Sequence, residues 1–222
     1  ALLRVGARLL AVQDDAYCAC WIDLPDLRVT RFVLAADGAP LPKAGKPDFE
    51  AAVRTVDGRI HLLGSGSTRQ RTVIARIDLA SESVALSDVP QIYDCVQRAL
   101  ALANGPNIEG ATVDGDVLRL FHRGIVTASA TIDLPLGVLD GEPPEVLAWR
   151  WIRLGQLEGV PLSVTDAAMV GRHRTLFLAV AEDTIDAIAD GPVVGCAIGL
   201  LTGSPDRPEA SWCRVLDADG RP

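Results

Sequence analysis

Short apolar runs separated by turn residues dominate the chain, and long amphipathic stretches are scarce. Residues 59–63, 116–121 and 175–180 are such runs, rich in residues that favour strands, and the first two follow Asp57-Gly58 and Asp114-Gly115. This arrangement predicts β-hairpins. Because these runs carry apolar side chains on both strand faces, we expect each sheet to pack between two neighbouring sheets.

The same order of elements recurs along the chain. A strand of small residues, a tight turn with glycine, an apolar strand, a polar loop and a strand ending in an Ile-x-Leu-like triplet follow one another, and a weaker outer strand comes last. The turn glycines are spaced by 52 to 57 residues, which is close to the ~50 of kelch-type propeller blades. The repeats span residues 1–36, 48–90, 107–153 and 164–217, and their turn glycines are Gly6, Gly58, Gly115 and Gly171.

These repeats predict an all-β protein, a β-propeller with four visible four-stranded blades in a single domain over residues 1–222. The pattern begins and ends part-way through a repeat, so we expect a five-bladed propeller with truncated ends; a closed four-bladed ring is the alternative. One helix is expected, at residues 95–103, ended by Asn104-Gly105.

Charge and hydropathy exclude several function classes. Lysine and arginine number 21 against 29 acidic residues, and the basic residues are scattered, which argues against nucleic acid or an anionic membrane as partner. The longest membrane candidate, residues 193–201, is far shorter than the roughly 18 residues of a spanning helix, and no signal peptide is evident. The compartment stays open, with the cytoplasm slightly favoured. Five cysteines without Cys-x-x-Cys spacing predict reduced, mostly buried thiols.

Acidic residues recur at the start of the innermost strand, which lines the channel of a propeller. Glu50, Glu109 and Asp166 hold this position in three repeats, so we expect their carboxylates to converge at one channel mouth. Such a cluster needs a compensating charge, which predicts a divalent cation such as calcium, or a basic ligand. The alternative is structural, with the acids accepting hydrogen bonds from backbone amides of the neighbouring blade.

Polar loops follow the second strand of each repeat and would face the same mouth; in the first repeat this loop contains Asp14-Asp15. The Gly64-Ser-Gly-Ser67 loop, Arg69, Arg71 and Arg123 are candidates for holding a phosphate or carboxylate group. His122 is a weak candidate for a general base or metal ligand; a hydrogen-bonding role in the loop is the alternative.

Several motifs carry a resemblance to known families. Residues 46–53, Leu63-Gly-Ser-Gly-Ser67, Asn107-Ile-Glu-Gly110 and residues 159–168 resemble an uncharacterised bacterial β-propeller family, a domain of unknown function. The Asn-x-Glu-Gly element is distantly similar to that of esterase-like phytase propellers. This second resemblance implies a divalent metal and a phosphate ester, and adds Asn107 to the candidate ligand-binding residues.

Two functions follow from these expectations. The first is a propeller that binds a small-molecule or protein ligand at the channel mouth. The alternative is a metal-dependent hydrolase of a small phosphate ester or lactone, in which a carboxylate-bound metal activates water.

Overall fold

The computed structural model describes residues 1–124, 128–184, 191–204, 207–217 and 220. Its strands form four antiparallel sheets, and in each sheet the strands lie side by side in sequence order. The chain divides into two compact units. The first unit comprises Ala1–Gln97 and Leu102–Ile108, and the second comprises Arg98–Ala101 and Glu109–Pro222.

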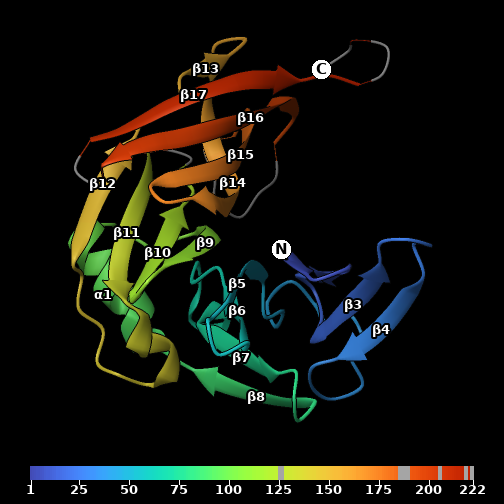
Figure 1. Ribbon diagram of the computed structural model, residues 1–222. Coiled ribbons are helices and arrows are strands. Elements are labelled where there is room, and N and C mark those ends of the chain that lie inside the picture. Colours follow the sequence, from blue (N-terminus) through green and yellow to red (C-terminus); the bar gives the residue numbers. More distant parts are fainter. Residues whose placement is uncertain (125–127, 185–190, 205–206, 218–219, 221–222) are drawn as a thin grey trace. The chain divides into compact units, whose positions relative to one another are not determined.

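The first unit contains two four-stranded sheets (Figure 1). The first sheet consists of β1 (Leu2–Val5), β2 (Arg8–Val12), β3 (Cys18–Asp23) and β4 (Val29–Val33). The second sheet consists of β5 (Phe49–Arg54), β6 (Ile60–Gly64), β7 (Val73–Asp78) and β8 (Ser83–Asp88).

A shared apolar core joins these two sheets. Leu10, Ala19 and Trp21 of the first sheet belong to one buried cluster with residues of the second sheet, namely Phe49, Ile60, Leu62, Ala75 and Ile77. All residues of β6 are buried, as expected for a strand covered on both faces. Removal of this apolar surface from water is the main force that holds the two sheets together.

Helix α1 (Pro90–Leu100) follows β8, and it begins and ends earlier than the sequence predicts. Proline is favoured at a first helical position, because its missing N–H would have no partner inside the helix. The helix ends at Ala101, which has a φ of 51°, while the Leu102 N–H donates to the Gln97 carbonyl. The expected termination at Asn104-Gly105 is therefore wrong, since alanine takes the left-handed position that usually falls to glycine.

The second unit contains the other two sheets. The third sheet consists of β9 (Ile108–Asp114), β10 (Val117–His122), β11 (Ser129–Pro135) and β12 (Ala148–Ile152). The fourth sheet has five strands, namely β13 (Gln156–Leu157), β14 (Val160–Gly171), β15 (Arg174–Glu182), β16 (Val193–Ser204) and β17 (Arg207–Val215). Two 3₁₀ turns, η1 (Arg69–Arg71) and η2 (Leu136–Asp140), complete the elements.

Three of the four repeat glycines adopt the expected left-handed backbone. Gly6, Gly58 and Gly115 have positive φ angles of 62°, 90° and 61° and connect the first and second strands of their sheets. In the fourth sheet the left-handed residue is His173 instead, with φ of 55°. Gly171 pairs with Arg174 across the hairpin, so Arg172 and His173 form the turn and the left-handed residue lies two positions beyond the glycine.

The cysteines agree with the sequence-based expectation only in part. All five have free thiols, but the expected burial is wrong for most of them, because only Cys18 is buried and Cys196 and Cys213 are exposed. Among the described residues, no helix has the length and hydropathy to span a bilayer. The fifth blade and the single-domain organisation stay predictions.

Candidate functional site

Charged side chains gather where three segments of the first unit meet. These segments are the β2–β3 loop, the residues just before β5 and the β6–β7 loop. A β-bulge between Phe49 and Ala51 places Glu50 outside the regular pairing of β5 with β6. Bulges redirect a side chain that would otherwise alternate with its neighbours. We call the resulting cluster the Asp48 network, which comprises Asp14, Lys46, Asp48, Glu50 and Arg71.

Asp48 is the centre of this network and is only 4% exposed. Its carboxylate lies 2.6 Å from Lys46 Nζ and 2.9 Å from an Arg71 guanidinium nitrogen. It also accepts a hydrogen bond from Ser65 Oγ at 2.5 Å. A buried carboxylate is tolerated when its charge is paired and its oxygens are hydrogen-bonded.

The backbone of Asp48 is also in an unusual conformation. Its φ of 55° lies in the left-handed region, which aspartate adopts more readily than most residues. Its N–H donates to the Asp14 carbonyl, and its own carbonyl accepts from the Ser65 N–H, both at 2.9 Å. Both neighbouring loops therefore hold the backbone that positions this carboxylate.

Lys46 bridges two carboxylates. Its ammonium lies 2.5 Å from Asp14 Oδ2 and 2.6 Å from Asp48 Oδ1, and the lysine side chain is 14% exposed. Burial acts to lower the pKa of Lys46, but the hydrogen bonds and charges of Asp14 and Asp48 outweigh it and raise that pKa. Burial likewise acts to raise the pKa of Asp14, but the Lys46 contact lowers it overall. Both groups are therefore held in their charged forms.

Arg71 enters the network from η1 and is buried. Its guanidinium donates to Ser67 Oγ at 2.8 Å, in addition to the Asp48 contact. Close backbone packing fixes this loop, because a Cβ at Gly64 would lie 2.3 Å from the Arg71 carbonyl oxygen. Only glycine fits there, so the sequence positions Arg71 through a residue without a side chain.

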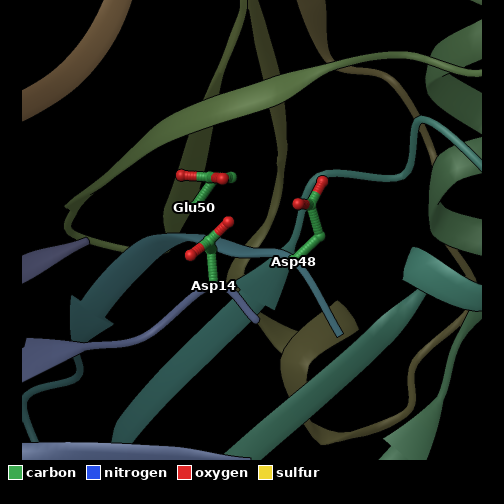
Figure 2. A group of neighbouring side chains, drawn as sticks. All are labelled: Asp14, Asp48 and Glu50. Carbon is green, nitrogen blue, oxygen red and sulfur yellow. The ribbon is translucent and has the colours of Figure 1, made fainter. Parts of the chain in front are cut away.

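Three carboxylates of the network face one another (Figure 2). Asp14, Asp48 and Glu50 each offer an oxygen, and these oxygens all lie within 4.8 Å of one another. Ligands of one calcium ion at 2.3–2.6 Å can be about 5 Å apart, so the spacing suits a single divalent cation. The Lys46 ammonium already forms ion pairs with two of these acids, Asp14 and Asp48, and a metal ion would have to compete with it.

The second unit contains a related arrangement, the Arg123 network of Glu109, Arg123 and Glu182. Arg123 lies after β10 and forms ion pairs with Glu109, at 3.3 Å, and with Glu182. Its Nε is buried and has no hydrogen-bond partner among the described residues. A cavity of about 100 Å³ adjoins it, and Ser163 and Asp183 are among the other residues that line this space.

Asp166, the third predicted metal ligand, lies on β14 just after a register shift in its pairing with β15. Burial raises the pKa of this carboxyl, and a hydrogen bond from the Ala167 N–H opposes the rise. Glu50 belongs to the first unit, whereas Glu109 and Asp166 belong to the second. Their convergence on one metal ion stays a prediction.

The remaining predicted residues differ in their surroundings. Arg69 is 63% exposed and lies 3.7 Å from Asp88, whereas Asn107 and His122 are buried. Arg71 and Arg123 contact carboxylates of the protein itself. The roles of these residues in ligand binding or catalysis stay predictions.

The sequence reasoning missed Lys46 and Asp48, and it placed Asp14 in a polar loop at the same mouth as Glu50 without making it a candidate ligand. One signal was present, because Asp48-Phe49-Glu50 occupies the same place in its repeat as Asn107-Ile108-Glu109. Asn107 was a candidate, so its counterpart Asp48 deserved the same status. The roles of Asp14 and Lys46 depend on how loops meet in space, which the repeat does not encode.

Comparison with protein families gives one match. The model of a family of unknown function, DUF6929, matches residues 1–222. No curated protein sequence matches the chain.

Solved structures show the fold. An exo-1,5-α-L-arabinanase from a bovine ruminal metagenomic library is similar over 95% of this chain and 76% of its own, with a TM-score of 0.52 and 11% identity. This likeness, together with the four antiparallel sheets, identifies a β-propeller with the sheets as its blades. The N-terminal domain of Nup159 matches at 13% identity and a TM-score of 0.39. That match covers 98% of this chain but only 47% of the Nup159 chain.

Proposed function

The chain belongs to the family of unknown function DUF6929, and from that premise we propose that it is a binding propeller whose Asp48 network takes a small cationic ligand. The conformation and burial of Asp48 carry this proposal. A buried carboxylate in a left-handed backbone conformation costs free energy. Such costs are concentrated at functional sites, where the surrounding structure holds a group in place for a ligand.

The charge balance of the network favours a cation. Its three carboxylates outnumber Lys46 and Arg71 by one negative charge. The Asp14 side chain is 49% exposed, so solvent and ligands can reach the network from this side. The Lys46 ammonium occupies the network when no ligand is bound, and an incoming cation either displaces it or binds beside it. Arg71 stays in place, because its guanidinium is buried and anchored by Ser67.

Calcium is the direct probe of this site. The thermal unfolding midpoint of the full chain is measured across a calcium titration, for the wild type and for Lys46→Met. Binding to the native state raises the midpoint. Because Lys46→Met removes the competing ammonium, we expect the variant to bind calcium at least about tenfold more tightly, which corresponds to ~1.4 kcal/mol.

Two variants complete this experiment. Glu50→Gln removes a carboxylate of the network and should abolish the calcium response, whereas Glu145→Gln, at an exposed loop position, should leave it intact. If neither the wild type nor Lys46→Met responds to calcium, the network is not a cation site and the proposal fails.

The alternative function is a metal-dependent hydrolase. The spacing of the three carboxylates, which suits one divalent ion, supports this alternative. A divalent ion held by Asp14, Asp48 and Glu50 would lower the pKa of a bound water and supply a nucleophile. Hydrolysis of p-nitrophenyl phosphate and of a simple lactone, with calcium or with EDTA, separates the two functions. We expect no turnover; activity that EDTA and Glu50→Gln both remove would establish the hydrolase instead.

A further inference from the structure

A groove of about 390 Å³ lies between the first and second sheets, away from the Asp48 network. Val5 and Arg8 flank the β1–β2 turn and Asp78 and Glu82 lie at the β7–β8 turn, whereas the Asp48 network lies at the loops on the other end of these strands. We call it the Trp21 groove. Its apolar lining consists of Val5, Trp21, Phe32, Ile77 and Leu79.

The size and lining of the groove suit a small organic molecule. Ligand pockets have volumes of roughly 300–1,000 Å³ and apolar walls with a few polar groups. Trp21 and Phe32 form an aromatic wall, with ring centroids 6.5 Å apart and planes inclined by 57°. Ile77 of the second sheet is fully buried beneath the groove, whereas Leu79, just after β7, is partly exposed, so an aromatic ring in the groove would contact Leu79 on this side.

The cationic side chains of the groove are already engaged. The Arg8 guanidinium lies 4.3 Å from the Trp21 ring centroid and 3.3 Å from Asp23. Arg31 donates to the Gly38 carbonyl at 2.6 Å and to Cys18 Sγ. Neither guanidinium is therefore poised to recognise an anionic ligand.

The acidic side chains of the groove differ in their partners. Asp78 Oδ1 accepts hydrogen bonds from the Ala80 and Ser81 amides, and the Ser81 side chain and the Arg59 charge also act on this carboxylate. Glu82 is exposed, and within the described part of the chain its carboxylate has neither an ion pair nor a hydrogen bond. It stands at a left-handed backbone position with φ of 53°, which fixes the direction of the turn beside the groove.

We propose that the Trp21 groove binds an aromatic amine. Its ring lies between the Trp21–Phe32 wall and Leu79, and its ammonium faces Glu82 and Asp78. The Arg8 guanidinium already lies over the Trp21 ring, so the ammonium of the ligand is directed to the turn carboxylates and not to that ring face. The binding is independent of the Asp48 network and does not rest on the function proposed for it.

The test uses 2-phenylethylamine and the full chain labelled with ¹⁵N at its four tryptophan indoles. Titration should shift the Trp21 indole resonance in a saturable manner, and a Trp21→Phe variant assigns that resonance. Phenylacetate has a similar size but the opposite charge, so it should bind more weakly. Equal shifts with both compounds, or no movement of the Trp21 resonance, would overturn the proposal.

Three substitutions locate the site. Thr30→Phe places a bulky side chain at an exposed strand position in the groove and should abolish the shift. Glu82→Gln should weaken binding about two- to fivefold, as expected for an exposed charge pair, while Glu145→Gln should have no effect. Unchanged affinity in both groove variants would refute the site, and the folded state of each variant is verified by its amide spectrum.

Discussion

Replacing Asp48 by asparagine tests whether the Asp48 network is a buried ion-pair system. Asparagine has the same shape and tolerates the left-handed backbone of this position, so the substitution mainly removes charge. It leaves Arg71, whose side chain is 8% exposed, without its carboxylate partner. Breaking a buried pair in this way costs about 3–5 kcal/mol. Because Lys46 keeps Asp14 as a partner, we expect about 3 kcal/mol, the lower end of this range.

Asp23→Asn is the matched control. Asp23 also contacts two cationic side chains, but Arg8 and Arg28 are 45% and 73% exposed. Exposed pairs contribute about 0–1 kcal/mol, so this variant should lose less than ~1 kcal/mol. For a chain of this size, ~1 kcal/mol shifts the unfolding midpoint by about 2–4 °C, which predicts a loss of about 6–12 °C for Asp48→Asn.

The assay is denaturant unfolding followed by far-UV circular dichroism, with thermal unfolding as a second measure. The double variant Asp48→Asn/Arg71→Met removes the stranded charge as well and should recover part of the loss. If Asp48→Asn and Asp23→Asn lose equal stability, then solvent screens the Asp48 network as it screens a surface pair, and the argument from burial is refuted.

Two further predictions concern the acid on β14 and the packing of α1. Burial raises the pKa of Asp166 above its ordinary value of 3.8, so the ionised form is disfavoured in the folded state. Asp166→Asn should therefore stabilise the protein at pH 7. The gain in unfolding free energy should vanish below pH 3.8, where the carboxyl is protonated in both the folded and the unfolded state. A gain that persists in urea titrations at pH 3 would contradict burial as the cause. A Cβ at Gly66 would lie 2.1 Å from Cδ1 of Tyr93, whereas one at Gly115 would meet nothing within 4 Å. Both glycines have positive φ, so Gly115→Ala should show the conformational cost alone, a loss of about 1 kcal/mol of unfolding free energy. Gly66→Ala should cost clearly more. Equal losses in denaturant unfolding would show that Tyr93 moves aside freely.

The repeats predicted the sheets well because they encode local structure. Turn glycines such as Gly58 and Gly115 need a left-handed backbone wherever the hairpin forms, so their spacing reports the strands directly. The fourth hairpin deviates because His173 supplies the left-handed residue; histidine adopts this conformation more often than most residues, but the glycine spacing pointed to Gly171. The end of α1 deviates for the same reason, since Ala101 takes the place of a glycine.

The candidate site was predicted only in part. Glu50 was identified because it holds a fixed place in the repeat, and the bulge at this position gives that place a structural basis. Lys46 and Asp14 lie 32 residues apart in the sequence and meet only through the packing of two loops. Such contacts between irregular segments have no periodic signature, so hydrophobic patterning cannot reveal them.

The order of strands within each sheet has a consequence for how the chain acquires its structure. Within each sheet, every strand after the first pairs with its immediate predecessor, so each sheet is a series of hairpins. Pairings between neighbours in sequence cost little loop-closure entropy and form faster than pairings between distant strands. The Asp48 network requires segments from two successive sheets, and it therefore assembles only after their hairpins have formed. A growing polypeptide can complete Asp14 and its loop long before the β6–β7 loop emerges, so closure of this network marks a late step in the folding of the first unit.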